Sequence, residues 1–113
     1  MENLTDSVWE YAQNNPYGFT LNIETMKPVR FGIVVAYKAT QNSFGKENLK
    51  SVISHALEHD KTVGGWLNDE DDKYYFDSVK VFKNSQQQEA IEMGRENEQI
   101  AVFDLTNLRE IRL

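Results

Sequence analysis

Two aspartates lie inside segments that the sequence predicts to be strands: Asp77 follows three aromatic residues and Asp104 follows three apolar ones. Strands disfavour aspartate, so each carboxylate needs a hydrogen-bonding partner or a chemical role. The structural interpretation is that each accepts hydrogen bonds from a neighbouring turn or from Arg30, Arg95 or Arg109. The functional interpretation is that both carboxylates converge on a small pocket and act as acid and base. Two aromatic residues complete that predicted pocket: Trp66 and Tyr75.

A second cluster of carboxylates separates two strand-like segments. Its residues are Asp69, Glu70, Asp71 and Asp72. Clustered carboxylates suit calcium, but this run lacks the ligand spacing and the central glycine of an EF-hand loop. A solvated hairpin tip is the simplest interpretation. The alternative is an acidic prong that engages basic residues of a partner protein, and these four residues are the predicted partner-binding site.

The segment from His55 to His59 matches H-x-x-E-H, the signature of a class of zinc proteases. On a helix, residues four apart share one face, as a zinc site requires. The simpler interpretation is two polar side chains that flank an apolar stripe, with His59 in the last turn, where the helix dipole favours a cation. The sequence therefore predicts no metal and no cofactor.

Composition limits the classes of partner. The 113-residue chain carries a formal net charge of −6, with 18 acidic and 12 basic residues. Such a surface repels nucleic acid, so we expect no direct nucleic-acid partner and favour a basic protein surface. There is no cysteine, no apolar run near the roughly 20 residues of a membrane span, and no signal-peptide pattern at the N-terminus. We therefore expect a mature, cytoplasmic protein with no membrane association.

Hydrophobic periodicity indicates the elements that position these residues. Helices are expected over 6–14, capped by Thr5, over 46–59, and from Ser85, where Gln88 completes a capping-box pattern. Strands are expected over 19–23, 30–38, 62–67, 74–82, 100–105 and 110–113. The order α-β-β-α-β-β-α-β-β predicts one α+β domain over residues 1–113, with about three helices and a mostly antiparallel sheet. The last strand could lie at a sheet edge and pair with a second copy in a homo-oligomer.

Two adjacent glycines precede Trp66 and do not form a phosphate-binding loop, because they lack the required lysine and do not lead into a helix. Gly64 and Gly65 instead predict a close backbone approach or a bulge, with an aromatic side chain covering the gap. We expect Trp9 and Trp66 to be core residues rather than a stacking platform.

Several short motifs are distinctive in their order: Gly64-Gly65-Trp66, Tyr74-Tyr75-Phe76-Asp77, the pattern A-x-x-x-G-x-x-x-x-Q at Ala90, Gly94 and Gln99, and Gln99-Ile100-Ala101-Val102-Phe103-Asp104. In this order they resemble a family of small uncharacterised proteins of bacteriophages and mobile elements, notably of gut bacteria. The resemblance covers nearly the whole chain and implies no catalytic residue. It implies a setting in which small acidic cytoplasmic proteins bind host proteins, including defence nucleases.

The sequence thus favours a non-enzymatic, protein-binding accessory factor of a phage or mobile element, including the role of an inhibitor of a host defence protein. The alternative is a small-ligand-binding or enzymatic module that uses Asp77 and Asp104.

Overall fold

The long strand β6 (Lys73–Phe82) organises the fold, which is known from a computed structural model that describes residues 3–113. Three α-helices are present in this part of the chain: α1 (Leu4–Gln13), α2 (Gly45–Leu57) and α3 (Gln87–Glu96). The remaining strands are β1 (Phe19–Asn22), β2 (Lys27–Pro28), β3 (Ile33–Ala36), β4 (Ser43–Phe44), β5 (Thr62–Asn68), β7 (Ala101–Asp104) and β8 (Arg109–Arg112). Two 3₁₀ turns, η1 (Lys38–Thr40) and η2 (Asn84–Gln86), connect them.

The strands form one sheet of eight strands within residues 3–113, in the order β2-β1-β5-β6-β3-β7-β8, with β4 added beside β6. All of these pairings are antiparallel. The predicted α+β class and the predicted element order are confirmed, and the structure adds the two-residue strands β2 and β4. The apolar strand β3 is central, between β6 and β7, as its composition predicts.

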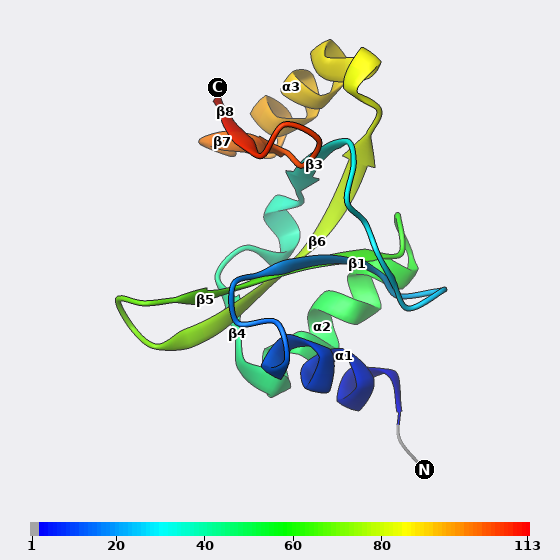
Figure 1. Cartoon of the computed structure of the whole chain (residues 1–113), viewed down its shortest axis with the longest axis vertical. Coiled ribbons are helices and arrows are strands. Elements are labelled where there is room, and N and C mark those ends of the chain that lie inside the picture. The colour runs from blue at the N-terminus through cyan, green and yellow to red at the C-terminus, as the bar shows by residue number, and fades with distance from the viewer. Residues whose placement is uncertain (1–2) are drawn as a thin grey trace.

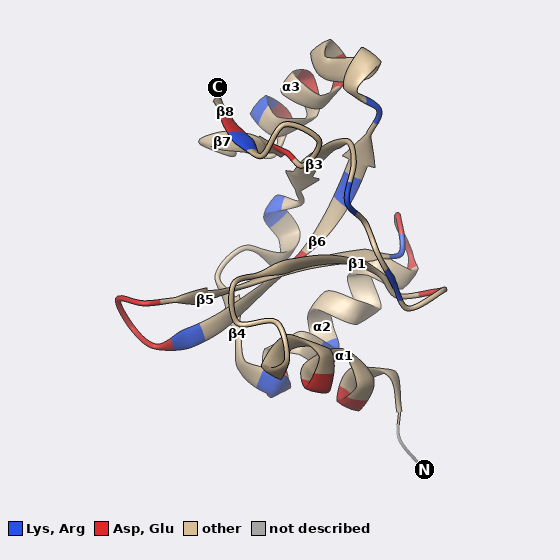
Figure 2. Ribbon diagram, viewed as in Figure 1, with Lys and Arg blue, Asp and Glu red and all other residues tan. Residues whose placement is uncertain are grey.

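Strand β6 belongs to both halves of the sheet (Figure 1). Its residues 73–78 pair with β5, and its residues 79–82 pair with β3. The β5–β6 hairpin projects away from the rest of the fold, and its far end is acidic (Figure 2). The β5–β6 hairpin therefore connects the two halves of the sheet and also projects from the fold as an exposed arm.

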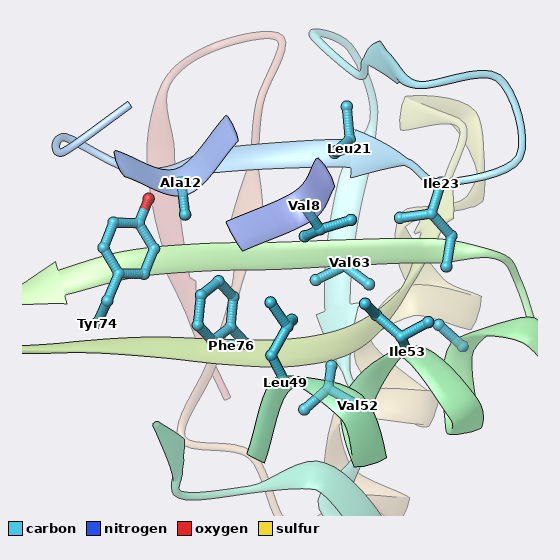
Figure 3. Packing of buried hydrophobic residues seen from close by; sticks show 11 residues of the cluster. Val8, Ala12, Leu21, Ile23, Leu49, Val52, Ile53, Val63, Tyr74 and Phe76 are labelled. Carbon is cyan, nitrogen blue, oxygen red and sulfur yellow. The ribbon is translucent and has the colours of Figure 1, made fainter. Parts of the chain in front are cut away.

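The larger hydrophobic cluster lies where α1 and α2 cover β1, β5 and the first half of β6 (Figure 3). The apolar stripe predicted for α2 supplies Leu49, Val52, Ile53 and Ala56, all buried. Leu57 continues the same spacing but is exposed, because α2 ends there. A smaller cluster joins α3 to β3, β7 and the second half of β6, with five buried residues: Ile33, Val35, Phe82, Ala90 and Val102.

Two helix starts differ from the predictions. The side chain of Asn3, not of Thr5, caps α1: its Oδ1 accepts a hydrogen bond from the Asp6 backbone N–H at 2.9 Å. Before α3, the Gln86 side chain accepts from the Lys83 backbone N–H at 3.1 Å, so the chain turns earlier than the Ser85–Gln88 pattern indicates. Asn3 is as good a cap as Thr5 by residue type, and local sequence does not distinguish them.

None of the helices within residues 3–113 combines the length and the apolar character needed to cross a membrane.

Candidate functional site

The helix-free face of the sheet is hollowed into a groove of about 760 Å³. Side chains alternate along β3 and β6, so Val34, Ala36 and Val79 point away from the residues that pack on the helices. The groove crosses β1, β5, β6, β3 and β7, so it spans both halves of the sheet. The residues that line it include Thr20, Gly64, Trp66, Asp77 and Phe103.

Asp77 lies on the floor of this groove. It is directly opposite Gly64 of β5, which is in turn opposite Thr20 of β1. Because Gly64 has no side chain, space stays open beside the carboxylate. No hydrogen bond or ion pair within residues 3–113 neutralises Asp77, and burial raises the pKa of its carboxyl group to about 6. A carboxylate in this state is half-buried, reachable and electrostatically unsatisfied.

Aromatic and aliphatic side chains surround the groove. Trp66 is 46% exposed, and its ring stacks on that of Tyr75 with the centroids 5.2 Å apart and the planes at 20°. The expectation that Trp66 is a core residue is therefore wrong, because its position in β5 places it on the helix-free face. Trp9, by contrast, packs against the larger cluster. Three further exposed apolar side chains line the groove: Tyr17, Phe103 and Leu108.

The second strand aspartate has a different environment. Asp104 is only 1% exposed and accepts hydrogen bonds from the Asn84 side chain at 3.0 Å and from the Asn107 side chain at 2.8 Å. The Asn107 backbone N–H donates at 3.1 Å, and the Arg109 Nε lies 3.6 Å away. These hydrogen bonds, those of Asn107 and Asn84 above all, lower the pKa of Asp104 to about 2. Asp104 thus holds the β7–β8 turn together.

The register keeps the two aspartates apart. Asp104 pairs with Ile33, and Ile33 pairs with Phe82, which is five residues beyond Asp77 in β6. At roughly 3.3 Å per residue, Asp77 and Asp104 are separated by about 16 Å along the strands. They also face opposite sides of the sheet, since Asp104 shares the face of Ile33. Of the four predicted pocket residues, the groove brings together Trp66 and Asp77, and it includes neither Tyr75 nor Asp104.

The predicted partner-binding residues form the ordered tip of the β5–β6 hairpin. The Asn68 side chain accepts from the Glu70 backbone N–H at 2.9 Å, and the Asn68 carbonyl accepts from the Asp72 N–H at 2.8 Å. Asp71 accepts the Tyr75 hydroxyl at 2.5 Å, and this bond lowers the pKa of its carboxyl group. The carboxylates of the tip are all exposed: Asp69, Glu70, Asp71 and Asp72.

An aromatic strip supports this tip on one side. The ring of Phe44 lies 5.5 Å from that of Tyr75, which stacks on Trp66. The Lys73 Nζ sits 4.1 Å from the centre of the Phe44 ring. We call these three rings, Phe44, Tyr75 and Trp66, the aromatic strip. It leads from the acidic tip to the rim of the groove.

The two histidines at the C-terminal end of α2 make internal contacts. His55 lies in the last turn, whereas His59 follows the end of the helix, not in its last turn as predicted. His55 Nδ1 lies 2.8 Å from the Ser78 hydroxyl, and His59 Nδ1 lies 2.7 Å from the His55 carbonyl oxygen. Their rings stack in parallel, 3.8 Å apart, and the ring of Tyr37 lies about 5 Å from each. Within residues 3–113, no group of three or more His, Cys, Asp or Glu side chains is arranged to hold a metal ion.

Sequence reasoning missed most of the groove wall. Phe103 of β7 and Leu108 of the turn between β7 and β8 line the same groove as β5 and β6 only because of the tertiary structure. The available signal was alternation: Val34, Ala36 and Phe103 have the opposite parity to buried neighbours in their strands. Without the register, parity alone does not show that these faces join.

Comparisons of the chain with protein-family models, with curated proteins and with solved structures find no match. The function therefore has to be inferred from the geometry of the groove and of the hairpin.

Proposed function

We propose that this chain is a non-enzymatic binding factor that engages a basic protein surface through the tip of its β5–β6 hairpin. The observation that carries the proposal is the placement of four exposed carboxylates at the end of a projecting arm (Figure 2). Lys73, beside the tip, offsets part of this local charge, and its ammonium group lies over the Phe44 ring. A charged projection of this kind accelerates encounter with a partner of opposite sign.

The aromatic strip gives the arm a second source of affinity. The rings of Trp66 and Tyr75 stack at the base of the tip, with Trp66 exposed and Tyr75 partly exposed. Large aromatic side chains contribute much of the binding energy at protein interfaces, whereas rim charges chiefly set rate and orientation. The tip and the strip together form a continuous surface that combines steering with anchoring.

The resemblance to proteins of bacteriophages and mobile elements adds a biological setting to this proposal. A host defence protein that acts on nucleic acid must carry a surface rich in lysine and arginine. An acidic factor in the same cytoplasm could occupy that surface and inhibit it. This partner class is consistent with the net charge of −6.

The alternative module built on paired carboxylates has less geometric support. Asp104 is held by internal hydrogen bonds and does not line the groove that contains Asp77. A mechanism that needs both carboxylates at one substrate would have to bridge opposite faces of the sheet. The binding role requires no such rearrangement.

The test reverses charge at the tip. In the variant Asp69→Lys/Glu70→Lys, Asp71 keeps its bond to Tyr75, so the hairpin should stay folded. The immobilised protein is exposed to host lysate at about 50 mM and about 300 mM salt, and captured proteins are quantified by mass spectrometry. We expect specific capture by the natural chain to fall with salt, and capture by the variant to fall about tenfold at low salt.

A matched control has the same change in net charge at a distant site. Glu89→Lys/Glu92→Lys alters two exposed carboxylates of α3 and should leave capture unchanged. Equal capture by the natural chain and the tip variant would contradict the proposal. So would an equal loss in both charge-reversed variants, because this would indicate a response to net charge alone.

A further inference from the structure

The groove contains one charged group, the carboxylate of Asp77, that has no neutralising partner in the described part of the chain. The carboxylate of Asp77 is half-buried on an apolar floor, and no cation lies within ion-pair distance of it in the described part of the chain. Arg30 lines the same groove but forms no ion pair with Asp77. A desolvated carboxylate without a partner is costly, and a cation that enters from outside would relieve that cost.

The space beside Asp77 is shaped by its neighbours. Gly64 lies directly opposite it, and a methyl group placed on Gly64 would make only ordinary contacts, with the Val79 side chain at 3.4 Å and the Phe19 carbonyl oxygen at 3.8 Å. The hydroxyl of Thr20 comes next in the same row. A narrow group can therefore descend past Gly64 and reach the carboxylate, while the indole of Trp66 stands beside the entrance.

We propose that this groove binds an arginine side chain from an extended basic segment of the protein partner, with the guanidinium group paired to Asp77. The inference rests on the proposed function, and it identifies a second contact, separate from the acidic tip. A guanidinium group suits the site because it is planar, stacks on aromatic rings and offers paired donors to a carboxylate.

The groove favours an extended segment as the occupant. It crosses five strands and has exposed apolar side chains along its length, including Phe103 and Leu108. An isolated guanidinium ion would leave this apolar surface uncovered. A peptide would cover it with its own backbone and side chains, and would add their contacts to the single ion pair. The raised pKa of Asp77 is consistent with a carboxylate that a cation from a partner would stabilise.

The experiment uses the full chain and three probes. These are the peptide acetyl-Ala-Arg-Ala-amide, the same peptide with citrulline in place of arginine, and n-butylguanidinium. Citrulline keeps the shape of arginine and removes its charge. Binding is followed by NMR, from the indole N–H of Trp66 and the carboxyl carbon of Asp77. We expect the arginine peptide to shift both signals and to bind about tenfold more tightly than the citrulline peptide.

Two isosteric variants complete the test. Asp77→Asn should weaken the arginine peptide about tenfold, whereas Asp69→Asn, at the hairpin tip, should change its affinity by less than about twofold. Backbone amide spectra verify that both variants are folded. If the citrulline peptide binds equally well, if Asp77→Asn has no effect, or if no probe binds, the proposal is wrong. Butylguanidinium that binds as tightly as the peptide would contradict the extended occupant.

The proposal for the groove and the proposal for the hairpin tip can be overturned independently of each other. The tip variant Asp69→Lys/Glu70→Lys should still bind the arginine peptide, because it leaves Asp77 and Gly64 in place. Loss of lysate capture in that variant, with intact peptide binding, supports both sites. Intact capture in the tip variant overturns the proposed function of the tip, and the peptide titration then decides the groove on its own.

Discussion

At the scale of single residues, the two strand aspartates show how environment decides the role of one side-chain type. Asp104 is buried and accepts several hydrogen bonds, so it is stable as an anion and supports a turn. Asp77 is half-buried and has no such donors, so its anion is disfavoured. The same residue type is a structural anchor at one position and a candidate recognition group at the other.

This contrast predicts the effect of Asp77→Asn on stability. The pKa of Asp77 is about 6 in the folded chain, against an ordinary value of 3.8. The folded state thus binds a proton more tightly than the unfolded state, and the ionised group destabilises the fold above pH 6. The natural chain regains stability as the pH falls through 6 toward 3.8. We expect Asp77→Asn to be more stable at pH 7 by about 1–3 kcal/mol, and the difference to shrink near pH 4.

Urea unfolding of both proteins at neutral and acidic pH measures this difference. His55, whose pKa is lowered chiefly by burial, titrates in both proteins, so its contribution cancels. Asp69→Asn is the exposed control and should not change stability. Equal stability of the natural chain and Asp77→Asn at pH 7, or a difference that grows on acidification, would contradict the assigned environment of Asp77.

The sequence indicated that both aspartates were unusual and favoured internal hydrogen bonds for each. This interpretation holds for Asp104, whereas no hydrogen bond reaches the Asp77 carboxylate within residues 3–113. Of the three arginines considered as partners, Arg109 lies near Asp104, at 3.6 Å. The donors closest to the Asp104 carboxylate are asparagines, and one of them, Asn84, lies 20 residues earlier in the chain. That contact depends on how η2 packs beside β7, and the local sequence pattern carries no information about this packing.

At the scale of elements, the two glycines of β5 serve opposite faces. A methyl group on Gly65 would lie 2.4 Å from the Phe19 ring and 2.8 Å from the Tyr74 ring. The predicted close approach is therefore present, although a ring rather than a backbone makes it, and the continuous β5–β6 register has no bulge there. Gly64 faces the groove, where an added methyl group makes ordinary contact with Val79.

The pair predicts a large difference between two adjacent substitutions. Gly65→Ala should destabilise the fold by about 1–3 kcal/mol, because the Phe19 ring is packed against Tyr11 and Phe76 and cannot move aside freely. Gly64→Ala should change stability by less than about 0.5 kcal/mol. Urea unfolding of both variants checks this. Comparable destabilisation by the two substitutions would mean that the faces of β5 are assigned incorrectly.

Helices and strands were predictable here because periodicity is a local property of the chain. The stripe of α2 and the hairpin of β5 and β6 appear in short windows. Pairing is not local. The short strands β2 and β4 have two residues each, too few to show alternation, and they form only because β1 and β6 offer free edges. The groove depends on pairings that join distant strands, so it was not predictable.

At the scale of the whole molecule, strand β6 joins two hydrophobic clusters of unequal size. Among residues 3–113, the larger has eleven buried residues and the smaller has five. At the junction, the Ser78 backbone N–H donates to the Thr40 hydroxyl at 3.0 Å, and the Ser78 hydroxyl bonds His55. Ser78 is fully buried, so these hydrogen bonds satisfy its polar groups at the point between the two clusters.

Unequal clusters predict unequal resistance to opening. Stability follows the apolar area that each part buries, so α3, β3 and β7 should open while α2, β1 and β5 remain folded. Native-state hydrogen exchange should give the first group opening free energies about 1–3 kcal/mol below those of the second. Strand β6 provides an internal control, since Val79–Phe82 should follow the smaller cluster and Tyr74–Phe76 the larger. If all these amides share one opening free energy, the two clusters form a single cooperative unit.

Because the groove wall includes Phe103 of β7, separate opening of the smaller cluster would also expose and reshape the groove. An arginine peptide bound in the groove should therefore raise the hydrogen-exchange protection of β7.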